Sequence, residues 1–203
     1  SWVRVPIVKT FQEEFKVPAW LDNDANAGAC AEYLFGAGQG CRHMVFLTFG
    51  TGLGAGIIAN GDIYRGANCY AGEVGHIRLA EDGPVGWHKA GSFEGFCSGG
   101  GITQVACARR ATWKGETVLP ASPTTKDVGE GAEKGDPLAI EILKETGARL
   151  GYGLSILLDI LNPERIVIGS IFVKCEKFLR PEMERVIREE ALSNTSEICR
   201  IVP

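Results

Sequence analysis

The sequence lacks the features that mark several classes of protein. Its 203 residues contain no internal repeat, no low-complexity segment and no cluster of Lys and Arg, and the formal net charge is −4. A chain without a basic patch lacks the electrostatic footprint of a protein that binds nucleic acid or an anionic membrane. The most apolar stretch, Leu154 to Leu161, is too short to span a bilayer. We therefore expect a soluble protein that acts on a small molecule, with no membrane partner and no nucleic-acid partner for this segment.

Cysteine pairs and a secretion signal are missing as well. The seven cysteines form no C-x-x-C motif and their number is odd, so the pattern favours reduced thiols over a disulfide framework. No signal peptide is recognisable at the N-terminus. Both observations predict a cytoplasmic protein.

A polar run at residues 22–26, with the sequence D-N-D-A-N, is the first candidate site. An extended apolar segment containing Pro18 precedes it, and Asp24 or Asn26 can cap a helix that continues to Leu34. The run therefore falls at an expected strand-to-helix corner. Two carboxylates and two amides exceed what a cap needs, although capping alone stays an alternative. A carboxylate there could accept the proton of an alcohol during phosphoryl transfer.

A glycine-rich segment between two expected strands is the second candidate. Residues 44–49 and 57–59 form the strands, and Asn60-Gly61 is typical of a type I′ hairpin turn. The pattern T-x-G-T-G-x-G-x-G over residues 48–56 lets backbone N–H groups point at a polyanion, with Thr51 adding a hydroxyl. It is neither a Walker A loop nor a dinucleotide fingerprint, because no Gly-Lys-Ser/Thr follows and the next element is a strand. A tight turn without a ligand stays the alternative.

A third cluster lies in the glycine-rich residues 66–101, which we expect to form packed loops around a site. Glu73 and His76 occur in G-E-V-G-H, and Glu94 follows in G-S-F-E-G. Carboxylates and imidazoles are strong acceptors for the hydroxyls of a sugar ring. A histidine between glycines is more often a structural residue, so this cluster gains weight only together with the other two.

The other elements complete an α/β pattern with enough apolar material, 45% of residues, for one large domain plus part of a second. Asp136-Pro137 starts the longest helix, whose apolar face runs from Leu143 to Leu161. We also expect short helices at 10–15 and after a cap at Asp127, a buried strand at 165–169, a last helix at 181–192 and a final strand at 198–202.

Taken together, these segments resemble the ROK family of bacterial sugar kinases and their repressor relatives. The matching stretches cover the chain from about Val17 to Ser170 in the family's order: VPAWLDNDANAGACAE, TFGTGLGAGIIANGDIYRGANCYAGEVGH, AGSFEGFCSGGGI and NPERIVIGS. The resemblance implies an actin-like, hexokinase-type (ribonuclease H-like) α/β fold, incomplete at both ends. Residues 1–34 would end a smaller N-terminal domain and hinge, and residues 35–203 would form the larger domain. ATP and Mg²⁺ would bind between the domains.

The resemblance also assigns roles to particular residues. Asp24 would be the catalytic base, and the sugar contacts would be Asn23, Glu73, His76 and Glu94. The second phosphate loop would comprise Gly50, Thr51, Gly52 and Gly54. Gly169 would lie on the adenosine side, where Ser170 replaces the family's second glycine. The family's first phosphate loop, D-x-G-G-T, and its A-G-x-x-G-A segment are absent from the sequence.

A zinc site of many family members is also absent. These members carry C-x-C-G-x-x-G-C, but here Val85, Trp87 and Ser92 occupy the three Cys positions, which leaves His76 without thiolate partners. We therefore predict no bound structural metal. Apolar packing of Trp87 is expected to hold the loop at 83–91 instead.

Three functions are compatible with the resemblance. The leading hypothesis is ATP-dependent phosphorylation of a hexose, above all glucose, or of an N-acetylhexosamine, at the 6-hydroxyl. The alternative is a sugar-sensing transcriptional repressor, and a non-catalytic sugar-binding module is a third reading. A homodimer is expected because family members usually form one.

Overall fold

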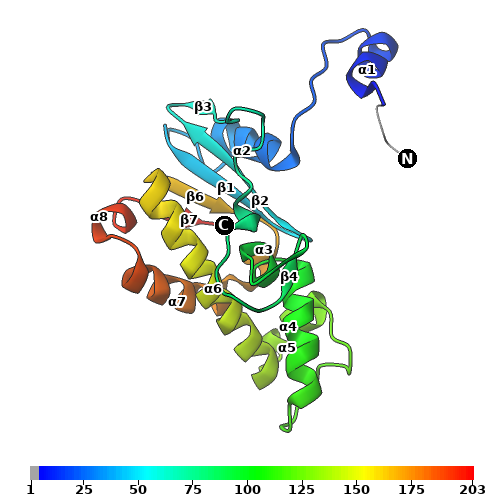
Figure 1. Ribbon diagram of the computed structural model, residues 1–203, viewed down its shortest axis with the longest axis vertical. Coiled ribbons are helices and arrows are strands. Elements are labelled where there is room, and N and C mark those ends of the chain that lie inside the picture. Colours follow the sequence, from blue (N-terminus) through cyan, green and yellow to red (C-terminus); the bar gives the residue numbers. More distant parts are fainter. Residues whose placement is uncertain (1–4) are drawn as a thin grey trace.

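The computed structural model describes residues 5–203, so the first four residues of the expected 1–34 segment lie outside it. A five-stranded sheet with the order β3-β2-β1-β6-β7 forms the centre of the molecule (Figure 1). β1 pairs antiparallel with β2 and parallel with β6, and β7 continues the parallel half. The strands are β1 Met44–Phe49, β2 Leu53–Ala59, β3 Asp62–Ile63, β6 Arg165–Ile168 and β7 Arg200–Val202.

The glycine-rich hairpin is shorter than its sequence suggests. β1 has the expected bounds, but β2 begins at Leu53, so only residues 50–52 form the turn. Glycine inside β2 serves packing, because a Cβ at position 56 would lie 2.4 Å from the Ala25 carbonyl oxygen. The second turn has the expected type I′ character, since φ is 55° at Asn60 and 89° at Gly61.

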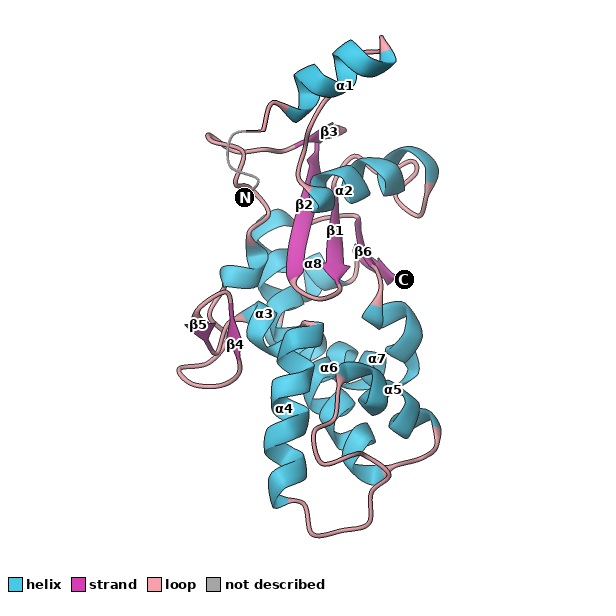
Figure 2. Cartoon of the chain, turned by 90° about the vertical axis from the view of Figure 1, so that its right-hand side faces the viewer, coloured by secondary structure: helices cyan, strands magenta, loops and turns pink. Residues whose placement is uncertain are grey.

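Helix α2 (Asp24–Phe35) covers one face of the sheet. Its buried Ala25 and Ala29 lie over β2, and Ala29 packs in a small core with Met44, Ile58 and Val167. Helix α1 (Ile7–Phe15) stands apart from the sheet, and none of its residues is buried (Figures 1 and 2). The domain boundary after residue 34 stays a prediction.

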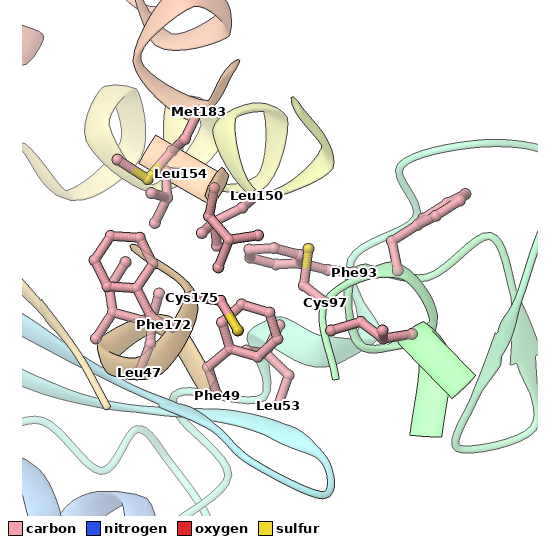
Figure 3. Close-up of a cluster of buried hydrophobic side chains, with 14 of the residues drawn as sticks. Leu47, Phe49, Leu53, Phe93, Cys97, Leu150, Leu154, Phe172, Cys175 and Met183 are labelled. Atoms are coloured by element: carbon pink, nitrogen blue, oxygen red, sulfur yellow. The ribbon is translucent and has the colours of Figure 1, made fainter. Parts of the chain in front are cut away.

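The opposite face of the sheet carries the main core. Alternate residues of β1, including Leu47 and Phe49, point toward helices α6 (Pro137–Leu161) and α7 (Ile171–Glu190). Figure 3 shows Phe93 and Phe172 among the side chains that meet Leu150 and Leu154 of α6 there. α6 starts after Asp136 as predicted, because this residue is the N-cap and Pro137 is at the first helical position.

The helix predicted at 181–192 is present, but its predicted start was wrong, because α7 begins ten residues earlier and contains Pro181 in its interior. Tertiary packing overrides the proline here. A Cβ at Gly147 of α6 would lie 2.4 Å from the Leu179 carbonyl oxygen, and a Cβ at Gly151 would lie 2.7 Å from that of Met183. These glycines let the backbones of the two helices approach closely, and the contact stabilises the helix across the proline.

The segment expected to consist of loops, residues 66–101, contains several short elements. They are the 3₁₀ helix η1 (Val74–His76), strands β4 (Val85–Gly86) and β5 (Lys89–Ala90) and helix α3 (Phe93–Phe96). Helix α4 (Gly99–Thr112) was not predicted, because three glycines open it.

Two further helices complete the described chain, α5 (Thr125–Glu133) and α8 (Ser193–Ser196). Thr124, not Asp127, caps α5, and Asp127 bonds back to Thr124 in a capping box. Within residues 5–203, no helix is both long enough and apolar enough to cross a membrane.

Candidate active site

The corner at residues 22–26 is a helix start that follows a coil. Residues 17–21 lie within the described chain and form no strand, contrary to the expected strand-to-helix corner. Asn23, and neither Asp24 nor Asn26, is the N-cap: its Oδ1 accepts hydrogen bonds from the N–H groups of Ala25 (2.8 Å) and Asn26 (3.4 Å). Asp24 is the first residue of α2, where the positive end of the helix dipole stabilises a carboxylate.

Asp22 connects the start of α2 to the loop that follows β3. Its Oδ1 accepts a hydrogen bond from Nδ2 of Asn26 at 2.9 Å, and its Oδ2 accepts two from Arg65 in the loop after β3. The bonds from Asn26 and Arg65 hold the pKa of the Asp22 carboxyl below its usual range. The start of α2 also lies beside the first residues of β2, just after the glycine turn, because a Cβ at Gly54 would lie 3.6 Å from the Ala25 Cβ.

A pocket of about 450 Å³ brings together three predicted sugar contacts, Glu73, His76 and Glu94. They come from η1, its preceding residue and α3, which are separate in sequence but packed against β2. Among the described residues, the rest of the lining consists of Leu53, Tyr70, Gly75 and Trp87, so Asn23 and Asp24 do not contribute to its wall.

Glu94 connects this pocket to the glycine turn. Its Oε2 accepts a hydrogen bond from the Leu53 N–H at 3.1 Å, and a Cβ at Gly52 would lie only 2.9 Å from the same oxygen. A side chain at position 52 would therefore displace the carboxylate. Glycine there keeps Glu94 in place at the base of the turn.

The other side of the turn faces a second pocket of about 550 Å³. Gly50 and Thr51 line it, whereas Gly52 and Gly54 are not among the described lining residues. The remaining wall is formed by Gly99, Thr125, Lys126, Gly129, Glu130, Glu133, Ile171, Lys174 and Cys175. Lys174 beside the glycine turn suits a phosphorylated ligand, whereas Lys126 pairs with Glu130 of the same wall at 3.6 Å.

The contributions of α5 and α7 to this pocket were missed by the sequence interpretation. Thr125 at the start of α5 donates a hydrogen bond from Oγ1 to the Gly99 carbonyl at 2.5 Å, which joins α5 to α4. Lys174 and Cys175 belong to the first turns of α7, and burial raises the pKa of the Cys175 thiol. The T-x-x-D pattern at residues 124–127, which forms a capping box, is the sequence signal that could have located the start of α5.

Gly169 lies beside this pocket, outside the described lining. Its N–H donates to the Leu47 carbonyl at 3.0 Å, so it continues the pairing of β6 with β1. Its neighbour Ser170 has φ 56° and ψ −105°, a backbone conformation that favours glycine. The lining resumes with Ile171 at the start of α7.

The loop at 83–91 is not held by Trp87, contrary to the sequence prediction. The Trp87 residue is 72% exposed, and the loop is a hairpin of β4 and β5 that is fixed by hydrogen bonds. Gln104 of α4 accepts from the Val85 N–H and donates to the Val85 carbonyl, each at 2.9 Å. Within residues 5–203, no group of three or more His, Cys, Asp or Glu side chains is arranged to hold a metal ion.

Comparison with known proteins gives the same family throughout. The sequence model described as "ROK family" matches residues 1–203. The chain is 38% identical over 178 residues to a glucokinase of Halalkalibacterium halodurans, covering 84% of this chain and 54% of the relative. It is 33% identical over 190 residues to the DNA-binding transcriptional dual regulator NagC of Escherichia coli, covering 92% and 46%. The chain thus spans about half the length of these curated relatives.

Solved structures agree with this assignment. A ROK family transcriptional regulator, a homologue of the E. coli MLC protein, superimposes with a TM-score of 0.87 at 30% identity, over 97% of this chain and 50% of that one. A ROK family glucokinase of Streptomyces griseus, solved with glucose and AMPPNP, superimposes with a TM-score of 0.83 at 29% identity, over 100% and 68%. These findings confirm the expected actin-like ATPase fold. The chain belongs to the ROK family and is glucokinase-like.

Proposed function

We propose that the complete protein transfers the terminal phosphoryl group of ATP to the 6-hydroxyl of a hexose, with glucose as the first choice and an N-acetylhexosamine as the second. The observation that carries this proposal is the glycine turn at residues 50–52. One side of it contacts Glu94 of a pocket rich in hydroxyl acceptors, and the other side lines a pocket with two lysines. A kinase needs such a junction, because the acceptor and the phosphate must meet in line.

On the sugar side, Glu73, His76 and Glu94 bind ring hydroxyls, and Asn23 at the helix start adds an amide. Asp24 accepts the proton of the attacking hydroxyl. Its place at the N-terminus of α2, close to the part of β2 that follows the glycine turn, supports this role, because it brings the carboxylate near the proposed phosphate site.

On the nucleotide side, Gly50 and Thr51 offer backbone N–H groups and a hydroxyl to the phosphates of ATP, and Lys126 and Lys174 neutralise their charge. Gly169 borders the adenosine end. ATP would supply the transferred group, and a Mg²⁺ bound with it would shield the negative charge of its phosphates. The glucokinase solved with glucose and AMPPNP supports this pair of ligands.

A sugar-sensing repressor is the second candidate. The 33% identity to NagC and the similarity to the MLC homologue favour it, because both relatives are regulators. In that case the same sugar pocket would control an equilibrium between conformations without turnover. For either function we propose a cytoplasmic homodimer.

A coupled assay of ADP release on the complete protein, with a panel of sugars, separates these functions. Asp24→Asn should lower turnover by about 10² to 10⁴ and leave glucose affinity within a few-fold. Asp62→Asn, which removes an exposed carboxylate on the edge strand β3, is the matched control. Glucose binding without turnover would favour the repressor, and a nearly active Asp24→Asn variant would exclude Asp24 as the base.

A further inference from the structure

Two exposed aromatic residues line the sugar pocket. Tyr70 is 69% exposed and Trp87 is 72% exposed, yet both form part of the wall that Glu73, His76 and Glu94 share. Leaving a large apolar ring in water is unfavourable. A ligand that covers these rings would remove their apolar surface from water, and this burial would contribute to the affinity for the ligand.

The backbone at Trp87 is strained. Trp87 and His88 form the two-residue turn of the β4–β5 hairpin, and both have positive φ, 40° and 64°. Such turns prefer Asn-Gly, which the chain uses in its other tight hairpin at Asn60-Gly61. A bulky aromatic residue in this conformation costs stability and points to a functional reason for its presence.

The hairpin is firmly attached to the sugar pocket. Lys89 donates a hydrogen bond from Nζ to the His76 carbonyl at 2.5 Å. Gly86 packs against Glu94, because a Cβ at position 86 would lie 2.8 Å from the Glu94 Cβ. With Gln104 holding Val85 on the other side, the base of the hairpin is fixed beside α3 and α4 (Figure 2). The tip with Trp87 is thus positioned in advance at the mouth of the pocket.

We propose that Trp87, together with Tyr70, forms an aromatic platform that stacks against a C–H face of the sugar ring. This inference rests on the proposed sugar pocket and adds to it a source of affinity that the polar residues do not provide. A pyranose ring carries most of its hydroxyls on its edge and exposes apolar C–H groups on its faces. The carboxylates and the imidazole bind the edge, and the indole covers the face and excludes water from those hydrogen bonds.

The platform and the polar residues have different effects on selectivity. Stacking does not depend on which hydroxyl is present, so Trp87 raises the affinity for glucose and N-acetylglucosamine by similar factors. Glu94 and His76 bind individual hydroxyls, so their substitution changes the ratio of the affinities for different sugars. A sugar-sensing protein and a kinase would use the platform alike.

The test is calorimetric titration of glucose and N-acetylglucosamine into the complete protein. Trp87→Asn removes the ring but suits the positive φ, so we expect about tenfold weaker binding of both sugars with an unchanged or higher Tm. Trp87→Phe should retain most of the affinity. His88→Asn relieves strain in the same turn without removing the platform, and should raise the Tm while leaving affinity unchanged.

Fluorescence gives an independent measurement. Saturation with glucose should change the tryptophan emission of the parent, and this change should disappear in Trp87→Phe. If Trp87→Asn binds both sugars within twofold of the parent while Glu94→Gln loses glucose affinity, the platform is wrong and the sugar pocket stands. If no sugar in the panel binds the parent, the proposed function and the platform fail together.

Discussion

Arg65 donates two hydrogen bonds to Oδ2 of Asp22, from Nη2 at 2.6 Å and from Nε at 3.2 Å. The pair connects the loop after β3 to the coil that enters α2. Because Asp22 also accepts from Asn26, its carboxylate bridges the segment 23–25, which contains Asn23 and Asp24. The orientation of the proposed base therefore depends on an ion pair that does not itself contact the pocket wall.

Replacement of Arg65 by Met should loosen this corner. We expect the free energy of unfolding to fall slightly, since the pair is a two-bond arginine–carboxylate contact at the surface. Turnover of the complete protein should fall further than sugar affinity. Urea unfolding and the coupled assay measure the two effects. Arg185→Met, which removes an arginine paired with two glutamates on α7, is the control and should leave turnover unchanged.

The pairing of Asp22 with Arg65 also predicts how the free energy of unfolding depends on pH. Hydrogen bonds from Asn26 and Arg65 lower the pKa of Asp22 in the folded state relative to its ordinary value of about 3.9. A lowered pKa adds stability above the unfolded pKa, and this stability is lost as the pH falls through the folded pKa. The difference in unfolding free energy between the parent and Arg65→Met should thus be present at pH 7 and shrink below about pH 4. A difference that grows in acid would contradict the pairing.

Substitution of Ser170 is predicted to raise the stability of the protein. Its φ of 56° and ψ of −105° lie where a Cβ is disfavoured, so Ser170→Gly should stabilise the protein by about 1 kcal/mol. Ser170→Ala keeps the Cβ and should bring no gain, which makes it the matched control. Thermal unfolding of the two variants against the parent decides the point. Equal Tm values for both variants would show that the backbone at 170 relaxes without cost.

Asp136 caps the longest helix and also binds a second segment. Its Oδ1 accepts from the Ala139 N–H at 2.9 Å and its Oδ2 from the Val118 N–H at 2.6 Å, and the residue is 5% exposed. Burial raises its pKa, but these backbone bonds outweigh burial and hold the pKa below its usual range. Asp136→Ala should cost about 2 kcal/mol, because it leaves buried N–H groups unpaired. Asp127→Ala, in an exposed capping box, should cost less in the same urea titration.

Several elements of the fold were predicted correctly from the sequence, and others were not. The Asp136-Pro137 start, the strand at 44–49 and the Asn60-Gly61 turn were predicted because each depends on local backbone chemistry. Pro181 misled the prediction, because the glycines of α6 that accommodate α7 lie some thirty residues away. Glu73, His76 and Glu94 were grouped because they lie in the same glycine-rich segment, and the family resemblance gave them the role of sugar contacts. The structure brings them to one pocket.

The wall of the second pocket could not be predicted in this way, because it is assembled from helices that are distant in sequence. Thr125 and Lys126 come from α5, and Lys174 and Cys175 come from α7, whereas the glycine turn belongs to the sheet. None of these side chains stands in a recognisable motif. Only the packing of α5 and α7 beside the turn makes them neighbours.

Substitution of Lys174 shows whether the second pocket binds the nucleotide. Its ammonium group lines the same pocket as Gly50 and Thr51, so removing the charge with Lys174→Met should raise the KM for ATP several-fold and leave the KM for glucose within twofold. Lys144→Met, which changes an exposed lysine of α6, is the control for loss of charge and should alter neither value. The assay varies ATP at saturating glucose and then glucose at saturating ATP. A rise in the KM for glucose alone would place the sugar in this pocket and reverse the assignment of the two sites.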